Sequence, residues 1–227
     1  MPLPYKTALI VGTGPGISAS LARALVAQGV RVAIASRHPE RLEGLARSIG
    51  GQAFGVDVVD AASVERLFAE VEVAFGVPDV VVFNPSARLR GPIAELDAEA
   101  VRRAVEVSTH GGFLVVQQAA RRLEPLGCGA ILITGATASV KGFPLSAPFA
   151  IGKFGLRGLA QSAARELAPK GIHVAHFVID GSVRRADDPE DRTLDPDAIA
   201  QTYLAVLAQP RSAWTWEVEL RPWVEQF

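Results

Sequence analysis

The chain is poor in the features that mark secreted, nucleic-acid-binding and membrane proteins. Its 227 residues include one cysteine, Cys128, so no internal disulfide can form and a reducing compartment is favoured. Lysine and arginine together number 23 against 24 aspartates and glutamates, which leaves no excess of positive charge to attract nucleic acid or an anionic membrane. No hydrophobic run approaches the roughly 20 residues of a membrane span. We therefore expect a cytoplasmic protein with no nucleic-acid partner and no membrane partner.

What the chain does contain is a regular alternation of short and long segments. Hydrophobic residues make up 49% and charged residues 21%, the balance of a globular domain. The short segments are β-branched and nearly continuously hydrophobic, as expected of strands buried on both faces of a parallel sheet. The predicted strands are Thr7–Val11, Arg31–Ala35, Gln52–Val56, Val80–Phe83, Ala130–Thr134, His173–Ile179 and, as an edge strand, Glu217–Leu220.

Longer segments with helical spacing of hydrophobic residues separate these strands. The predicted helices are Ile17–Gln28, Pro39–Ile49, Ala61–Phe75, Ala98–Leu123, Phe149–Leu167 and one that Asp195 caps and that runs to about Ala208. The sequence therefore predicts an α/β fold: a single Rossmann-type, doubly wound domain over residues 1–227, with a mostly parallel seven-stranded sheet between helices. The polar stretch Arg184–Arg192 is either a lid over a ligand or a solvated loop.

The first predicted strand runs directly into a glycine-rich turn, Gly12-Thr13-Gly14-Pro15-Gly16-Ile17. Glycines let the main chain approach a pyrophosphate closely, and the free N–H groups at the start of the following helix attract the anion. A tight turn needed only by the fold would account for one glycine but hardly for three. Because the turn lies between a strand and a helix, it predicts a dinucleotide-binding site.

The end of the second predicted strand indicates which dinucleotide is bound. A protein selective for NAD usually places a carboxylate there to hold the ribose 2′-hydroxyl. Here the strand ends in Ser36-Arg37-His38, and no carboxylate follows until Glu40. Arginine can donate paired hydrogen bonds to a 2′-phosphate, so NADP is favoured over NAD. The alternative is that Arg37 is a surface arginine near the start of a helix.

With these features the chain resembles the short-chain dehydrogenase/reductase family over essentially its whole length. Gly12, Gly16 and Ile17 match the Gly-x-x-x-Gly-Ile turn of that family. The last glycine of the family's turn is replaced by Ser18. Asn84, the only asparagine in the chain, matches the second asparagine of the family's Asn-Asn-Ala-Gly motif.

The resemblance implies a nicotinamide cofactor, a small-molecule substrate and a homo-oligomer, either a dimer or a tetramer. The subunits would pack through the helices at Ala98–Leu123 and Phe149–Leu167. The cofactor-binding residues that it implies, together with those of the turn and the second strand, are Gly12, Thr13, Gly14, Gly16, Ile17, Ser36, Arg37, Asp57, Val58, Asn84, Pro85, Lys153, Gly181, Ser182 and Val183.

The catalytic positions implied by the resemblance are unusual. Ordinary members of the family reduce a carbonyl with a Tyr-x-x-x-Lys pair, in which tyrosine gives the proton and lysine holds the nicotinamide ribose. The matching pair here is Phe149 and Lys153, so only the lysine is kept. The family's catalytic serine aligns with Ala136 and its helical asparagine with Ser108. Since a general acid typically contributes about 10²–10⁴ in rate, we expect ordinary carbonyl reduction to be impaired.

Other groups near these positions could replace the missing tyrosine. The candidates are Thr134, Thr137, Ser139, Ser146 and His110. A hydroxyl without an activating base is a poor acid near pH 7, and a histidine on a helix is more often packed or solvated. Tyr5 and Tyr203, the only tyrosines, do not lie at the expected spacing. No metal site is expected, because His173 and His176 lie three residues apart on a strand and point to opposite faces.

Two functions of different classes follow. The first is an NADP(H)-dependent short-chain oxidoreductase with an atypical active site, which transfers hydride to or from a carbonyl, an alcohol or a conjugated C=C bond. Some relatives that reduce conjugated C=C bonds also lack the tyrosine. The second is a catalytically inactive dinucleotide-binding protein that acts as a sensor or a scaffold.

Overall fold

The sheet of this protein contains seven strands, all parallel. The computed structural model describes residues 3–184 and 186–226. The strands are β1 (Thr7–Val11), β2 (Arg31–Ser36), β3 (Gln52–Gly55), β4 (Val80–Phe83), β5 (Gly129–Thr134), β6 (Ile172–Ile179) and β7 (Glu217–Leu220), in the spatial order β3-β2-β1-β4-β5-β6-β7. Leu9 in the central strand pairs with Ala33 on one side and Val81 on the other. The predicted strands are confirmed to within two residues at each end, and the edge strand β7 also pairs in parallel.

Six helices connect these strands. They are α1 (Ile17–Ala27), α2 (Glu43–Ser48), α3 (Ala61–Phe75), α4 (Ala98–Leu123), α5 (Ala147–Leu167) and α6 (Pro196–Leu207). The helix predicted from Pro39 to Ile49 is divided, because a 3-10 turn at Pro39–Leu42 precedes α2. Helix α5 begins at Ala147, earlier than predicted, since Pro148 lies in its first turn, where its missing N–H is not needed.

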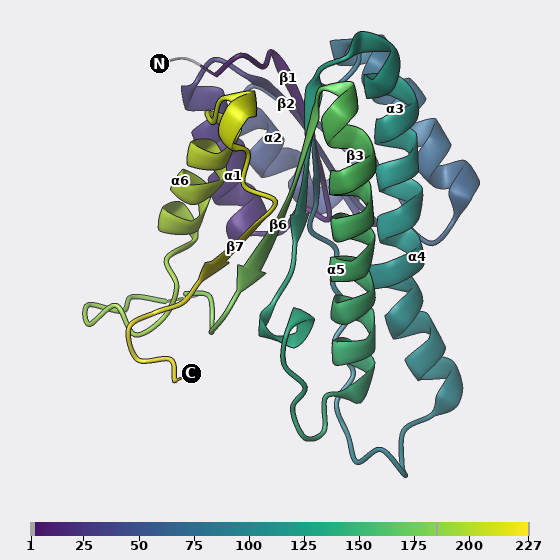
Figure 1. Cartoon of the computed structure of the whole chain (residues 1–227), viewed down its shortest axis with the longest axis vertical. Helices are drawn as coiled ribbons and strands as arrows, with labels where there is room; N and C mark the ends of the chain where they lie inside the picture. The colour runs from purple at the N-terminus through teal and green to yellow at the C-terminus, as the bar shows by residue number, and fades with distance from the viewer. Residues whose placement is uncertain (1–2, 185, 227) are drawn as a thin grey trace.

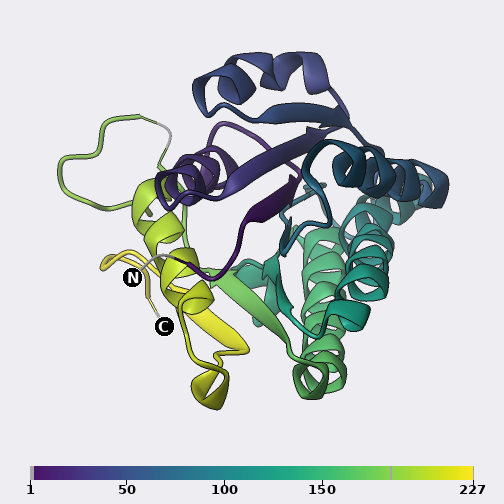
Figure 2. The same ribbon diagram turned by 90° about the horizontal axis from the view of Figure 1, so that it is seen from above.

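The helices cover both faces of the sheet (Figures 1 and 2). Helices α1, α2 and α6 pack on one face, where Leu25 belongs to a cluster with Phe177. Helices α3, α4 and α5 pack on the other, where Phe68, Val115 and Leu156 are fully buried. Because both faces of the sheet are covered, its strands are hydrophobic along almost their whole length.

The long helices α4 and α5 lie in close contact. A Cβ atom at Gly152 of α5 would come within 3.0 Å of Cβ of Ser108 on α4, and one at Gly112 would come within 2.6 Å of Leu156 Cδ1. The absence of these side chains lets the helix backbones approach closely. This packing fixes the position of the α5 face that carries Lys153.

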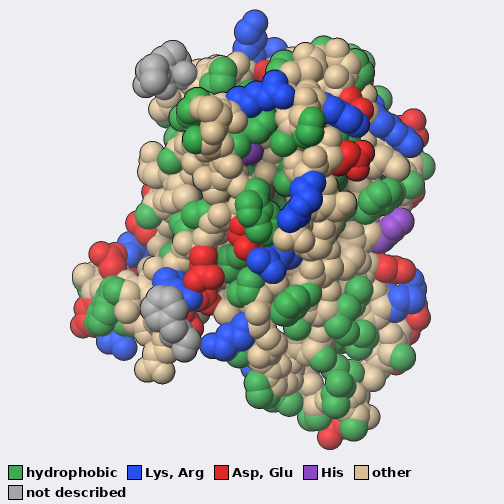
Figure 3. All heavy atoms as spheres, viewed as in Figure 1, with side chains coloured by type: hydrophobic (Ala, Val, Ile, Leu, Met, Phe, Trp, Pro, Cys, Tyr) green, Lys and Arg blue, Asp and Glu red, His purple; other side chains and the backbone are tan. Residues whose placement is uncertain are grey.

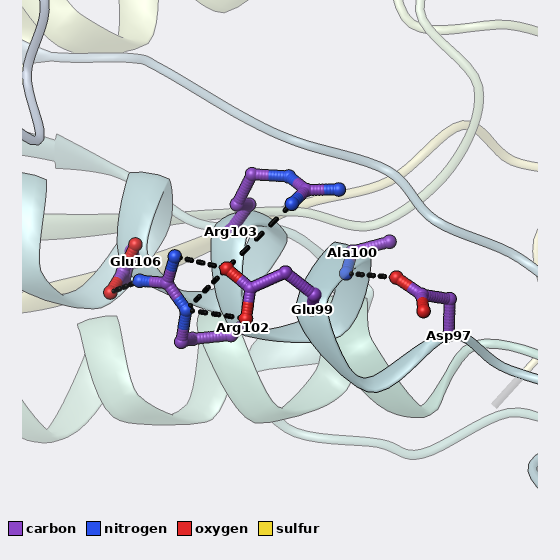
Figure 4. A network of polar contacts seen from close by, with 6 residues as sticks. All are labelled: Asp97, Glu99, Ala100, Arg102, Arg103 and Glu106. Atoms are coloured by element: carbon purple, nitrogen blue, oxygen red, sulfur yellow. Dashed lines mark hydrogen bonds and ion pairs between the residues drawn. The ribbon is translucent and has the colours of Figure 1, made fainter.

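Charged side chains stabilise the start of α4 (Figure 4). The carboxylate of Asp97 accepts a hydrogen bond from the N–H of Ala100 at 2.7 Å, which caps the helix. In the first turns, Arg102 binds the carboxylates of Glu99 and Glu106. Such a cap is worth about 1 kcal/mol, whereas exposed ion pairs contribute little. The cap fixes where the long connection after β4 ends.

The connections that follow β4, β5 and β6 gather at one end of the molecule, together with the C-terminal tail (Figure 1). This end holds the carboxyl ends of the strands. In sheets of this topology ligands bind there, beside the two central strands where the strand order reverses. Within the described ranges, no helix has both the length and the hydrophobicity needed to cross a membrane.

Candidate functional site

The turn after β1 is held tightly against the ends of its two neighbouring strands. The N–H groups of Gly12 and Thr13 both donate to the carbonyl oxygen of Ala35, each at 2.9 Å. Gly12 has φ of +83°, and a Cβ atom there would lie 2.4 Å from the backbone nitrogen of Pro85. Position 12 therefore requires glycine for conformational and steric reasons alike.

A side-chain bond joins this turn to the end of β4. The amide nitrogen Nδ2 of Asn84 donates to Oγ of Ser18 at 2.6 Å, and Ser18 in turn donates to the carbonyl oxygen of Gly12 at 3.3 Å. The backbone N–H of Asn84 donates to Val11. Ser18, which stands where a glycine was expected, therefore links the turn to the one asparagine in the chain.

The start of α1 has the properties of an anion-binding site. Its N-cap, Gly16, has no side chain to satisfy the first N–H groups, and the first turn carries no acidic residue. Neither Gly14 nor Gly16 has a positive φ, and a Cβ at either would meet nothing within 4 Å. The packing of the protein itself therefore does not explain these two glycines. Both line a cavity of about 650 Å³, which leaves room for a phosphate against the main chain.

A second cavity, of about 710 Å³, opens at the end of β2 and is basic. The side chains of Arg23, Arg37, His38 and Arg41 line it, and none of its lining residues in the described part of the chain is acidic. Sequence analysis singled out Arg37 but missed Arg23 and Arg41. Arg23 could have been found from helical spacing, because it lies one turn after Ala19, which lines the same cavity.

A third, smaller cavity of about 350 Å³ lies between the ends of β1, β3 and β4, where Asp57 and Val58 line it. The N–H of Asp57 donates to Ser63 Oγ at 3.1 Å, which holds this connection in place. The three cavities bring together twelve of the predicted residues: Gly12, Thr13, Gly14, Gly16, Ile17, Ser36, Arg37, Asp57, Val58, Asn84, Pro85 and Val183. The three cavities share lining residues and so form one continuous surface. Its residues fit a dinucleotide cofactor in shape and polarity.

A fourth cavity, at about 860 Å³ the largest of the four, lies beyond β5 and β6 and holds Lys153. It shares Ile17, Asn84 and Val183 with the cavity over the turn, so the two are continuous. The remaining predicted residues Gly181 and Ser182 also line it. The fifteen predicted cofactor residues therefore all line one connected set of cavities.

Lys153 is a buried cation, with a residue exposure of 2%. Its Nζ donates to the carbonyl oxygen of Thr134 at 2.9 Å. Burial, and next the positive charge of Arg88, lower the pKa of Lys153 to about 8. The side chain is therefore mostly protonated near pH 7, yet close to its titration range.

Phe149, one helical turn before Lys153, presents its ring to the same cavity. Nζ of Lys153 lies 5.9 Å from the ring centroid, and Cζ of Arg88 lies 4.9 Å from it. Ala136 also lines the cavity. Its backbone N–H donates to Ser139 Oγ at 3.1 Å. Neither Phe149 nor Ala136 has a proton to give.

Only some of the candidate replacements reach this cavity. Thr134, Thr137 and Ser146 line it. Thr134, however, is engaged through its hydroxyl with the hydroxyl of Tyr203 at 2.8 Å. Ser139 is fully buried and does not line the cavity.

Three further polar side chains lie away from the cavity. His110 is exposed on α4. Ser108 is buried against Gly152, and its hydroxyl has no hydrogen-bond partner within the described part of the chain. Tyr203 lies in the core, its ring stacked on Phe177 with centroids 3.6 Å apart, and burial raises its pKa.

The polar stretch after β6 is held by its own side chains. Arg184, which lines the cavity over the turn, pairs with Asp191 and, at 3.4 Å, with Asp195. The N–H of Thr193 donates to Asp188 at 2.7 Å. Residue 185 of this stretch lies outside the described residues.

Sequence analysis missed several residues that line the largest cavity. Arg88 and Phe143 come from connections after β4 and β5, and Glu225 comes from the C-terminal tail. No local pattern marks these residues, because each reaches the cavity only through the course of a connection.

Known proteins similar in sequence to this chain include dehydrogenases. The family described as short chain dehydrogenase matches residues 6–183. An L-2,3-butanediol dehydrogenase of Corynebacterium glutamicum is 31% identical, over 73% of this chain and 67% of that protein.

Solved structures match over almost the whole chain. An alcohol dehydrogenase of the archaeon Thermococcus sibiricus, complexed with 5-hydroxy-NADP, superimposes with a TM-score of 0.88 at 27% identity, covering 97% of this chain and 98% of that one. A metagenomic short-chain oxidoreductase in complex with NADP gives a TM-score of 0.86 at 25% identity, covering 99% and 100%.

Proposed function

Because this chain belongs to the short-chain dehydrogenase family, we propose that it is an NADP(H)-dependent oxidoreductase with an atypical active site. Its substrate is a small organic molecule with a carbonyl or alcohol group, or with a conjugated C=C bond. When bound, the nicotinamide cofactor supplies the hydride for reduction, or accepts it in the reverse direction. Reduction also consumes one proton, which goes to the substrate oxygen or carbon.

The observation that carries this proposal is the fit of the turn after β1 to a dinucleotide. Gly14 and Gly16 lie beside open space, at the positive end of a helix with no side-chain cap. The pyrophosphate would bind to the N–H groups there, and the adenine would lie beside Asp57 and Val58. Asn84, Lys153 and the segment 181–183 would hold the nicotinamide half.

The preference for NADP rests on the basic cavity at the end of β2. Arg23, Arg37, His38 and Arg41 surround a space with no acidic lining residue, which suits a 2′-phosphate and lacks the carboxylate that selects NAD. Two solved relatives, one complexed with 5-hydroxy-NADP and one with NADP, support the same choice.

The atypical chemistry rests on Phe149 and Ala136, which face the largest cavity without a hydroxyl. Lys153 would bind the ribose hydroxyls of the cofactor and add positive charge beside the reacting carbon. The proton would come from solvent or from a group other than a tyrosine. A reaction that does not need the tyrosine, such as reduction of a conjugated C=C bond, is therefore included in the proposal.

The second candidate function is a catalytically inactive dinucleotide-binding protein that acts as a sensor or scaffold. The observation in its favour is a contrast. The residues of the proposed cofactor site are present, whereas positions 136 and 149 carry no hydroxyl group. Restoring those hydroxyls distinguishes the two functions, as set out in the Discussion.

We also propose that the chain forms a homo-oligomer in the cytoplasm. Exposed hydrophobic side chains gather over the lower ends of α4 and α5 and the connection beneath them (Figure 3). Exposed hydrophobic side chains on these two helices include Phe113 of α4 and Ile151 and Phe154 of α5, each 45% to 54% exposed. Burial of these side chains in a subunit contact would remove hydrophobic surface from water. The exposed free thiol of Cys128 suits a reducing compartment.

The test of the proposed function is a pair of calorimetric binding titrations, one with NADPH and one with NADH. We expect NADPH to bind with a micromolar dissociation constant, at least about tenfold tighter than NADH, the difference of one charge-assisted contact. Failure of the folded protein to bind either cofactor would overturn the proposal.

A further inference from the structure

Arg88 lies in the connection between β4 and α4, and its side chain lines the largest cavity. The guanidinium carbon Cζ is 4.9 Å from the centroid of the Phe149 ring, close enough for a cation–π contact. Lys153 Nζ lies 5.9 Å from the same centroid. Two cationic side chains therefore meet at the ring that stands where the tyrosine of ordinary relatives would be.

These two cations lack a matching negative charge. The ammonium of Lys153 is bonded to a neutral carbonyl oxygen, that of Thr134. Arg88 has no ion pair with any carboxylate in residues 3–184 and 186–226. Its charge lowers the pKa of Lys153, so the two groups interact unfavourably. Among the described residues, Glu225 is the only acidic one that lines the cavity. The cavity therefore holds one more positive than negative group, and a monoanion would balance it.

The cofactor phosphates are not this anion. Arg88 lines neither the cavity over the turn nor the basic cavity at the end of β2, where the phosphates would bind. Several neutral residues line the same cavity as Arg88, among them Ala136, Thr137, Phe143 and Ser146. An anionic group on the substrate would supply the balancing charge.

We propose that the substrate carries a carboxylate and that Arg88 binds it, which places the reacting carbon beside Phe149 and Lys153. The inference rests on the proposed oxidoreductase function and names its substrate class. The planar guanidinium can donate two parallel hydrogen bonds to the two oxygens of a carboxylate. A monoanionic carboxylate balances the cavity, whereas a dianionic phosphate would exceed its charge. The carboxylate itself is unchanged in the reaction.

The test compares the unaltered protein with Arg88→Gln and with Arg90→Gln. Arg90 is exposed in the same connection and does not line the cavity, so its variant is the matched control. Each protein is titrated with benzoate by calorimetry in the presence of NADPH, and is assayed with 4-carboxybenzaldehyde and its methyl ester. Because Arg88 is exposed, Arg88→Gln should fold, which circular dichroism checks.

The unaltered protein and Arg90→Gln should bind benzoate and should prefer the acid to the ester by at least about tenfold, the effect of one charge-assisted pair. Arg88→Gln should lose both the binding and the preference and keep its affinity for NADPH. Equal benzoate binding by the unaltered protein and Arg88→Gln would overturn the inference, whether or not either aldehyde is reduced. Benzoate binding that depends on Arg88 in a protein that does not bind NADPH would instead overturn the proposed function and leave the carboxylate site standing.

Discussion

The side-chain nitrogen of Lys153 donates a hydrogen bond to the main-chain oxygen of Thr134 at 2.9 Å. This bond links the second turn of α5 to the carboxyl end of β5. It places a cation in the cavity of the proposed substrate site, which is continuous with the cavity over the glycine-rich turn. No carboxylate forms an ion pair with Lys153 among the described residues. A buried ammonium with one neutral acceptor costs stability, which indicates that its place is set by function.

We expect Lys153→Met to raise the free energy of unfolding at pH 7 by about 1–3 kcal/mol while weakening NADPH binding. Burial and Arg88 lower the pKa of Lys153 from its ordinary 10.5 to about 8, so the folded state disfavours the ammonium. Between those two values the unfolded chain binds more protons, and the stability of the unaltered protein rises with pH. The gain should therefore be largest at pH 7 and should shrink above pH 8. Urea unfolding of both proteins at pH 7 and pH 9.5 measures this gain in stability. An equal gain at both pH values would contradict a lowered pKa of Lys153.

Gly12→Ala should lower the stability of the protein, whereas Gly14→Ala should lower its affinity for NADPH. At position 12 a Cβ would lie 2.4 Å from Pro85 N at a φ of +83°, so we expect a loss of about 2–4 kcal/mol in the free energy of unfolding. At position 14 a Cβ meets nothing, so stability should stay within about 0.5 kcal/mol. NADPH affinity should nevertheless fall about tenfold or more in Gly14→Ala, because the methyl group occupies the phosphate space. Unchanged affinity in Gly14→Ala would mean that the pyrophosphate binds elsewhere.

Arg37→Ala and Arg41→Ala should each weaken NADPH binding by about tenfold and change NADH binding by less than about twofold. The reason is that both side chains line the basic cavity, where NADPH would place its 2′-phosphate and NADH only a hydroxyl. The matched control is Arg66→Ala, which removes an exposed arginine of α3 outside the cavity. Parallel titrations with both cofactors give the result. If NADH binding falls as much as NADPH binding, these arginines do not determine the preference.

The double variant Phe149→Tyr with Ala136→Ser distinguishes an atypical enzyme from an inactive binding protein. Both positions face the cavity of Lys153, so the new hydroxyls would lie beside that ammonium. In an inactive parent, the variant should gain carbonyl reduction on the order of 10²-fold over background, the contribution of a general acid. In an active atypical enzyme, the variant should instead lose turnover of the parent's substrate. NADPH oxidation by both proteins on a panel of aldehydes and enones is the measurement.

Tyr203→Phe should lower the free energy of unfolding by about 1 kcal/mol and leave NADPH affinity and any turnover unchanged. The phenol shares a buried hydrogen bond with Thr134 at 2.8 Å, and its ring is stacked on Phe177, outside the cavities. Thermal unfolding tests the expected loss of stability, and NADPH titration of the same preparation tests the unchanged affinity. A loss of turnover without a loss of stability would make Tyr203 part of the active site.

Much of the fold could be predicted from the chain alone. The runs at Val80–Phe83 and Thr7–Val11 are continuously hydrophobic because both faces of the sheet are covered, and that pattern is local. The turn at Gly12–Gly16 was equally visible, because its glycines lie together between a strand and a helix. The division of the segment 39–49 was not predicted, since a 3-10 turn and an α-helix have nearly the same spacing.

The sequence by itself determined the periodic elements and the residues that follow each strand, because hydrophobic spacing and backbone preference act over a few neighbouring positions. Only the tertiary structure decided which distant side chains share a cavity. Arg88 comes from the connection between β4 and α4, Phe149 from the start of α5 and Glu225 from the C-terminal tail, and all three line one cavity. The packing of whole helices and strands sets their separation, and no spacing along the chain records it. The proposed charge of the substrate therefore depends on the fold, whereas one short glycine-rich turn in the sequence already predicts a dinucleotide-binding site.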